Sequence, residues 1–254
     1  AVMNKPDKYL SYRAQITAIF QENRGVYGYR RIYLALKREG VILSEKIIRR
    51  IMKEEELTVL LSKKRKYSSY LGEITPEVEN IVSRDFHADQ PYEKLLTDIT
   101  EFAIPSGKLY LSAMIDCFDG KVAGWTTGTR PNADLVNTML DQVIANLPEG
   151  CHPVVHSDRG CHYRWPGWID RMNGAGLIRS MAKKGCSPDN AACEGFFGRL
   201  KNEMFYGRSW EKVSLDDFRQ EIDRYINWYN HKRIKISLGG LSPIEYRHHL
   251  GFAA

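Results

Sequence analysis

Paired cysteines and long apolar runs are both lacking in this sequence of 254 residues. Its five cysteines all follow residue 116 and none forms a C-x-x-C pair, which excludes the usual zinc-finger spacings and argues against a disulfide framework. No apolar run approaches the ~20 residues that a membrane-spanning helix needs, and residues 1–7 lack the apolar segment of a signal peptide. We therefore expect a protein of the reducing cytoplasm without a membrane partner.

The charge of the chain is unevenly distributed around a net value of +6. Residues 1–70 hold 16 Lys and Arg against 7 Asp and Glu, whereas the remainder holds 21 against 24. A basic arm joined to a near-neutral body indicates a polyanion such as nucleic acid, bound mainly through the arm. A solvated helical surface explains the charge alone equally well.

Residues 1–61 have the pattern of short helices joined by tight turns. Apolar residues recur at helical spacing before Gly25, a second helix ends at Gly40, and Ser44 is a good N-cap for a third. The pattern predicts a small all-α domain resembling a helix-turn-helix unit, although helical bundles without DNA function share it. The basic side chains that we expect to contact DNA in this domain are Arg30, Arg31, Arg49 and Arg50.

Residues 62–93 are interpreted as a basic linker that contains Pro76 and Pro91. A basic run can track a phosphate backbone, and a solvated charge run has the same composition. The run consists of Lys63, Lys64, Arg65 and Lys66.

Residues 94–254 change to the pattern of a mixed α/β domain. Three β-like segments with tight turns come first, and helices and strands then alternate, which predicts a mixed sheet. The expected strands are 95–104, 109–117, 122–129, 153–157 and 177–182, and the expected helices are 134–147, 165–173, 189–205 and 215–231.

Three acidic residues carry the strongest chemical signal in this domain. Asp98 lies in the first strand, Asp158 ends the fourth, and Glu194 lies in a helix, with 35 residues between Asp158 and Glu194. Hard divalent cations prefer carboxylate oxygens, and two Mg²⁺ ions about 3.5–4 Å apart can drive phosphoryl transfer. We therefore expect a two-metal site, with Asp98 bridging the ions and the other two carboxylates each holding mainly one.

Three further polar residues are candidates for contacts beside this site. Asn190 precedes Glu194 by four residues and Lys201 follows it by seven, so one continuous helix would place all three on one face. We expect Asn190 and Lys201 to lie where DNA phosphates bind. His156 is two residues before Asp158, where it can contact the scissile phosphate or serve as a packing residue.

The motifs around the acidic residues resemble the integrase core of bacterial insertion-sequence transposases. The class is the one whose catalytic part, of OrfB type, is made by frameshift fusion of two reading frames, and the 35-residue spacing is also typical of retroviral integrases. The resemblance covers nearly the whole chain. Its motifs are residues 96–100 (Leu-Thr-Asp-Ile-Thr), 156–160 (His-Ser-Asp-Arg-Gly) with Tyr163, 189–197 (Asp-Asn-Ala-Ala-Cys-Glu-Gly-Phe-Phe) with Leu200 and Lys201, 28–32 (Gly-Tyr-Arg-Arg-Ile) and 225–230 (Tyr-Ile-Asn-Trp-Tyr-Asn).

The resemblance implies a ribonuclease H-like fold, with a five-stranded mixed sheet flanked by helices, and a DDE active site. Asp98, Asp158 and Glu194 would bind two Mg²⁺ ions, for which Mn²⁺ can substitute, and Lys201 would contact transposon-end DNA. The implied reaction is 3′-end cleavage at the inverted-repeat ends, followed by strand transfer through a circular intermediate into target DNA. The implied partners are double-stranded DNA and further copies of the chain, in a dimer or a larger oligomer at the bacterial nucleoid.

The sequence departs from the family at Cys161 and His162, where the family often has Ser-Gln. A specific DNA contact at these positions is therefore left open.

Two alternative functions also remain, namely a DNA-binding regulator of transposition without catalysis and a structure-specific nuclease of the same fold. Only a transposase is expected both to cut DNA and to join it.

Overall fold

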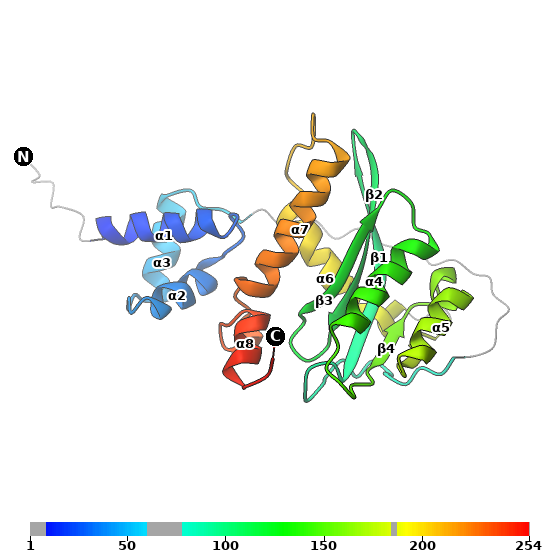
Figure 1. Cartoon of the computed structure of the whole chain (residues 1–254). Coiled ribbons are helices and arrows are strands. Elements are labelled where there is room, and N and C mark those ends of the chain that lie inside the picture. The colour runs from blue at the N-terminus through cyan, green and yellow to red at the C-terminus, as the bar shows by residue number, and fades with distance from the viewer. Residues whose placement is uncertain (1–8, 60–77, 184–186, 254) are drawn as a thin grey trace, which may run out of the picture.

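The computed structural model describes residues 9–59, 78–183 and 187–253 as a small helical domain, an α/β domain and a C-terminal helical arm (Figure 1). In these ranges no helix combines the length and the apolarity needed to cross a membrane. The helical domain consists of α1 (Leu10–Glu22), α2 (Tyr29–Arg38) and α3 (Glu45–Glu54). As the sequence predicts, Ser44 caps α3, because its hydroxyl accepts a hydrogen bond from the Ile47 backbone N–H.

The sheet has the order β3-β2-β1-β4-β5 and combines antiparallel and parallel pairs. β1 pairs with β2 and β2 with β3 in antiparallel fashion, whereas β4 runs parallel to β1 and β5 parallel to β4. The mixed five-stranded sheet expected from the sequence is thus confirmed. The strands are β1 (Lys94–Ile104), β2 (Gly107–Asp116), β3 (Val122–Gly128), β4 (Val154–Ser157) and β5 (Ile178–Met181).

Helices cover both faces of the sheet. Because neighbouring side chains of a strand point to opposite faces, Leu95 packs with α4 (Ala133–Ala145) and α5 (Pro166–Gly174), while Leu96 packs with the helices of the other face. The other face is covered by α6 (Ala191–Leu200) and α7 (Leu215–His231). β1 is therefore buried between two hydrophobic cores.

The helix expected over 189–205 is divided into three parts. A 3₁₀ turn (Ser187–Asn190) precedes α6, and a π-helical turn (Lys201–Phe205) follows it, closed by a hydrogen bond from the Tyr206 N–H to the Lys201 carbonyl. Glu203 within this turn accepts hydrogen bonds from Arg233 and from the Tyr225 hydroxyl. These contacts hold Glu203 toward α7, which explains why the regular α-helix ends at Leu200.

The C-terminal arm joins the helical domain to the α/β domain. The arm continues from α7 through a 3₁₀ turn (Ile236–Leu238) to α8 (Pro243–His249). Ile234 is part of the apolar core of the helical domain, and its N–H donates a hydrogen bond of 2.8 Å to the Tyr27 hydroxyl. The helical domain is thus packed directly on the arm.

Arg247 of α8 is fully buried between two carboxylates of the β2–β3 turn. Its Nη2 lies 2.7 Å from Asp116 Oδ2 and its Nε lies 2.6 Å from Asp119 Oδ2. Arg247 is more than 120 residues away from both aspartates in the sequence, so local turn patterns do not reveal this contact. The ion cluster fixes the end of the arm to the sheet.

We expect Arg247→Ala to lower the free energy of unfolding by about 3–5 kcal/mol, because two buried carboxylates lose their counter-charge. Urea denaturation of the wild type and the variant measures this change. Arg171→Ala is the matched control, since it removes a surface pair with Asp141 and should cost less than about 1 kcal/mol. Equal effects of the two substitutions would contradict the role assigned to Arg247.

Candidate active site

Asp98 and Asp158 meet at one cleft because β1 and β4 are parallel neighbours. The register places Thr97 opposite Ser157, so the next residue of each chain segment is one of the two aspartates. Both carboxylates line a cleft of about 240 Å³. The structure therefore brings two of the three predicted acidic residues together. The cleft is also lined by Ile99, Glu101, Tyr110, Pro131, Gly160, His162 and Tyr163.

Hydrogen bonds fix the direction of both carboxylates. Asp98 Oδ1 accepts from the Ile99 N–H at 2.7 Å, and its Oδ2 accepts from Asn190 Nδ2 at 2.9 Å. Asp158 Oδ1 accepts from the Gly160 N–H at 2.8 Å. A side chain at position 160 would place its Cβ 2.9 Å from this same oxygen, so the turn favours glycine. The Asp-x-Gly pattern signals such a turn.

The electrostatics of the cleft disfavour two negative charges. Burial, reinforced by the charge of Asp158, raises the pKa of Asp98 to about 7, although the hydrogen bonds from Ile99 and Asn190 oppose this shift. Burial also raises the pKa of Asp158, against the hydrogen bond from Gly160. Like-charged carboxylates that share a poorly solvated site behave in this way. The pair would be stabilised by a cation between them.

Glu194 stands beside this pair without joining it. Its side chain is exposed on α6, four residues after Asn190, and its charge contributes the smallest of the effects that raise the pKa of Asp98. Among the described residues, no three His, Cys, Asp or Glu side chains are arranged to hold a metal ion as they stand. Glu194, the third metal ligand predicted from the sequence, therefore lies near the cleft but does not complete a metal site with the two aspartates.

Asn190 and Lys201 both lie close to Asp98, but in different ways. Asn190 is buried and points its amide inward to Asp98, so in this structure it orients a carboxylate rather than facing a phosphate. The Lys201 ammonium lies 5.3 Å from the centre of the Phe102 ring. Burial lowers the pKa of Lys201, while the nearby charges of Glu101 and Asp98 oppose the shift. Lys201 thus lies close enough to Glu101 and Asp98 to feel their charges.

His156 is not placed for the DNA contact that its position in the sequence suggested. It is 0% exposed, with Nδ1 at 2.8 Å from Ser180 Oγ and Nε2 at 3.1 Å from the Asp189 carbonyl. Ser180 of β5 and the turn that contains Asp189 lie against the imidazole. His156 therefore connects two strands to the turn that precedes α6.

Arg31 also differs from the expectation of a DNA contact. Its Nε donates a hydrogen bond of 3.0 Å to the Ile234 carbonyl, so it belongs to the junction with the C-terminal arm. Arg30, Arg49 and Arg50 are exposed, and the first two lie over the ring of Tyr29. The basic run of Lys63, Lys64, Arg65 and Lys66 lies outside the described residues, so its DNA contacts stay a prediction.

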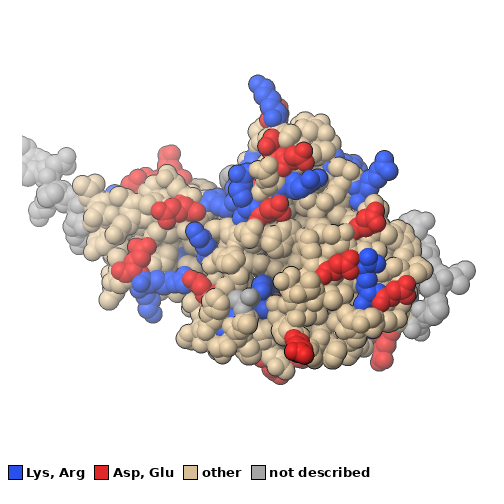
Figure 2. Space-filling model, in the orientation of Figure 1, with Lys and Arg blue, Asp and Glu red and all other residues tan. Residues whose placement is uncertain are grey.

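Basic side chains do not form one continuous band on the face shown in Figure 2. Lys and Arg alternate there with Asp and Glu over both domains. Pairs such as Arg13 with Glu54 and Arg24 with Glu221 explain part of this mixing. The uneven charge of the sequence thus does not become a single basic surface in this view.

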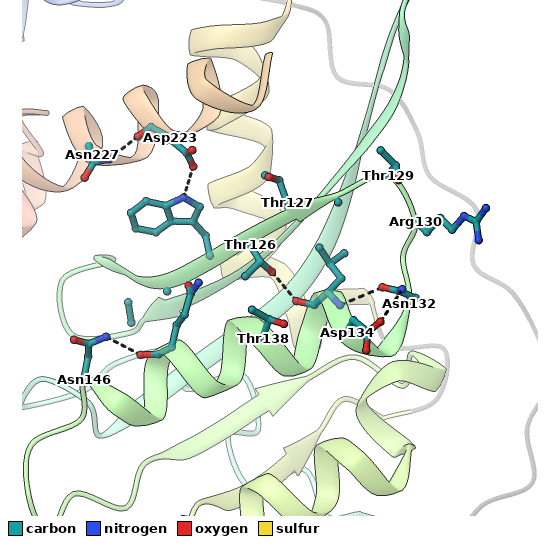
Figure 3. Close-up of a pocket in the computed structure, with 16 residues that line it drawn as sticks. Thr126, Thr127, Thr129, Arg130, Asn132, Asp134, Thr138, Asn146, Asp223 and Asn227 are labelled. Atoms are coloured by element: carbon teal, nitrogen blue, oxygen red, sulfur yellow. Dashed lines mark hydrogen bonds between the residues drawn. The ribbon is translucent and has the colours of Figure 1, made fainter. Parts of the chain in front are cut away.

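A larger hollow of about 870 Å³ lies between β3, α4 and α7 (Figure 3). Its polar groups are mostly bonded to one another: Asp223 accepts from the Trp125 indole N–H at 2.7 Å, and the Thr126 hydroxyl donates to the Leu135 carbonyl at 2.6 Å. Neither Asp98 nor Asp158 lines it. The chemistry is therefore assigned to the smaller cleft.

Comparison with protein families matches three stretches of the chain. Residues 10–66 match the model described as "HTH-like domain". Residues 88–186 and 194–250 match two models that are both described as "Integrase core domain". The Asp98–Asp158 cleft lies within the first of the two integrase-core matches, and Glu194 begins the second.

Two curated relatives are transposases of insertion sequences. The chain is 58% identical over 97% of its length to a probable transposase for element IS1353 of Shigella flexneri, of which it spans about half (48%). It is 42% identical over 96% of its length to the putative transposase InsK for element IS150 of Escherichia coli K12, of which it covers 86%.

A solved structure shows the same fold at low sequence identity. This is the simian T-cell lymphotropic virus intasome in complex with the PP2A regulatory subunit B56 gamma, matched with a TM-score of 0.50 and 16% identity over 88% of this chain and 70% of that one. The relatives, the family matches and the fold agree with the resemblance found in the sequence. The chain belongs to the insertion-sequence transposases with an integrase core, a family of DDE polynucleotidyl transferases.

Proposed function

We propose that this chain cleaves the 3′ ends of its insertion sequence and transfers them to a new strand, with two Mg²⁺ ions as cofactor and Mn²⁺ as a substitute. The observation that carries the proposal is the pair of half-buried aspartates, Asp98 and Asp158, held side by side by β1 and β4. Two carboxylates with raised pKa values in one cleft form an expected cation site. Their sequence context matches the integrase-core models.

The donor set of the cleft fits magnesium. All three candidate ligands, Asp98, Asp158 and Glu194, supply carboxylate oxygens, the donors that hard divalent cations prefer. When bound, a pair of Mg²⁺ ions would neutralise phosphoryl charge and activate the attacking oxygen. Asn190 keeps the Asp98 carboxylate turned into the cleft. Of the three candidate ligands, Glu194 must move furthest to reach a bound ion, since its side chain is exposed on α6.

Two displacements at this site account for the reaction. In the first, the oxygen of water attacks phosphorus and the 3′ oxygen leaves, which gives a 3′-hydroxyl and a 5′-phosphate. In the second, that 3′-hydroxyl attacks another phosphodiester and displaces its 3′ oxygen. Joining one end to the other first gives a circle, and a later repetition inserts the element into target DNA. Lys201 would hold a phosphate of the end during both steps.

The DNA partners follow from the same proposal. Arg30, Arg49 and Arg50 are the exposed guanidinium groups that would contact the inverted-repeat ends, and the run Lys63–Lys66 would add phosphate contacts. The chain spans about half of its relative from Shigella flexneri, so the whole protein can have further end contacts. We expect a dimer or larger oligomer to pair two ends at the nucleoid, in the cytoplasm of a bacterium.

We expect Asp158→Asn to abolish both cleavage and joining, by at least about 10³-fold, because a metal ligand loses its charge. The measurement uses duplex DNA that carries the terminal repeat of the encoding element, with Mg²⁺ and strand-resolving gels. Asp141→Asn is the matched control, since Asp141 pairs with Arg171 on the surface outside the cleft. Activity that survives Asp158→Asn would remove the basis of the proposal.

The same assay separates the alternative functions of the wild type. A structure-specific nuclease would cut the DNA without joining ends, and a regulator would bind the DNA without cutting it.

We expect Asn190→Ala to reduce the cleavage rate by about 10- to 100-fold, the usual effect of removing a group that orients a metal ligand. The affinity for Mg²⁺, measured by calorimetry without DNA, should fall together with the rate. Asn146→Ala is the control, because Asn146 bonds only its own helix, through the Gln142 carbonyl. If the affinity for Mg²⁺ is unchanged, Asn190 does not act through Asp98.

We expect the metal-free protein to lose stability as the pH rises from about 4 to 7. In this range the folded state retains a proton on Asp98, whose pKa is about 7, whereas the unfolded state has lost it, so deprotonation favours unfolding. Asp98→Asn should remove this loss and stabilise the protein at pH 8 by an amount on the order of 2 kcal/mol, reduced by partial solvation. Urea denaturation in EDTA at pH 5 and pH 8 measures it. An unchanged pH profile in Asp98→Asn would disprove the assignment.

A further inference from the structure

The segment that follows Asp158 presents an exposed aromatic side chain near the cleft. A 3₁₀ turn (Cys161–Arg164) leads from Asp158 to Trp165, which precedes α5. Trp165 is 37% exposed and is the only tryptophan among the exposed large hydrophobic residues of the described ranges. Over a third of its surface is therefore accessible to a ligand.

His162 connects this ring to the cleft. Its side chain lines the same cleft as Asp98 and Asp158. The rings of His162 and Trp165 meet edge to face, with their centres 4.9 Å apart and their planes at 90°. Together they form a short aromatic surface that extends from the wall of the cleft to the outside of the molecule.

The fold itself does not require the indole of Trp165. The start of α5 uses the backbone carbonyl of Trp165, which accepts hydrogen bonds from the N–H groups of Trp168 and Ile169. Any residue supplies that carbonyl. The helix is further specified by Pro166 at its first position. The exposed ring is therefore available for a ligand.

The position of the ring indicates what that ligand is. Under the proposed function a phosphodiester reaches Asp98 and Asp158 in the cleft, and His162 in the lining of that cleft places Trp165 beside the neighbouring nucleotide. Local departure of the strand from the duplex would let that phosphodiester enter the cleft. The base beside that phosphate then loses its stacking partner. An aromatic surface at the entrance can replace the lost stack.

We propose that His162 and Trp165 form a stacking platform that receives an unpaired base next to the scissile phosphate. This inference rests on the proposed cleavage function and adds a residue pair that would open the DNA end at the cleft. The Trp165 ring would stack on the base, and the edge contact of His162 would hold the indole in place. Stacking is tolerant of sequence, because every base has an aromatic face.

The decisive experiment compares cleavage of two end duplexes by the full chain, with Mg²⁺ present. One duplex carries the terminal repeat of the encoding element fully paired, and the other has a mismatch beside the cleavage phosphate. Trp165→Ala should cut the paired end about 5- to 100-fold more slowly than the wild type, and the mismatched end at nearly the wild-type rate. Trp165→Phe should retain cleavage of both. If Trp165 has only a structural role, Trp165→Ala slows cleavage of both duplexes equally. That result would overturn the proposal, as would no effect of Trp165→Ala on either duplex.

A matched control and a binding assay make the outcome independent of catalysis. Ile178→Ala removes another exposed apolar side chain, on β5 and outside the cleft lining, and should leave both rates unchanged. If the wild type does not cut, the proposed function fails, but binding of a single-stranded thymidine oligonucleotide still tests the platform. Trp165→Ala should then weaken binding about 5- to 100-fold, Trp165→Phe should not, and equal affinities of all three proteins would overturn the inference.

Discussion

The placement of two aspartates in one cleft is the constraint around which the α/β domain is arranged. β1 and β4 are parallel, and the register between Thr97 and Ser157 brings the next residues, Asp98 and Asp158, into one cleft. Like charges in a poorly solvated site oppose folding, so the surrounding structure must hold the two carboxylates together. β1 supplies that rigidity, because it is the central strand of the sheet and is buried between two hydrophobic cores. The unfavourable pair persists because breaking it would disrupt both cores.

Asp189 is a nearby buried carboxylate whose surroundings differ from those of Asp98 and Asp158. The contrast shows which carboxylates remain available for function. Asp189 is buried just before α6, but Arg84 binds it at 2.6 Å and the Lys183 N–H at 2.9 Å. Burial alone would raise the pKa of Asp189, yet these partners lower it. Its charge is thus satisfied within the protein, and its backbone carbonyl is bound by His156. Asp189 positions the start of α6, whereas Asp98 and Asp158 retain an unmet need for a cation.

The sequence predicted the sheet and the acidic pair better than it predicted the contacts around them. Alternating apolar residues and tight turns have local causes, so β1 to β3 and α7 lie close to where they were expected. The sequence left a DNA contact and a packing role open for His156 and predicted a DNA contact for Arg31, for one shared reason: periodicity tells which face a residue occupies but not which distant segment covers that face. Ser180 and Asp189 cover the first, and Ile234 covers the second. The inward turn of Asn190 likewise depends on where α6 docks on β1.

The C-terminal arm links the site to the helical domain through buried charges. Glu203 lies in the π-helical turn that begins at Lys201, and it is bound by Arg233 at the end of α7. The next residue, Ile234, belongs to the core of the helical domain and bonds to Tyr27. A shift of that domain would therefore strain the pair of Glu203 with Arg233, since a half-broken buried ion pair is costly. Through that pair, the position of Lys201 beside Asp98 is tied to the domain that carries the exposed arginines. If those arginines bind DNA as proposed, this link fixes the direction from which the DNA reaches the cleft.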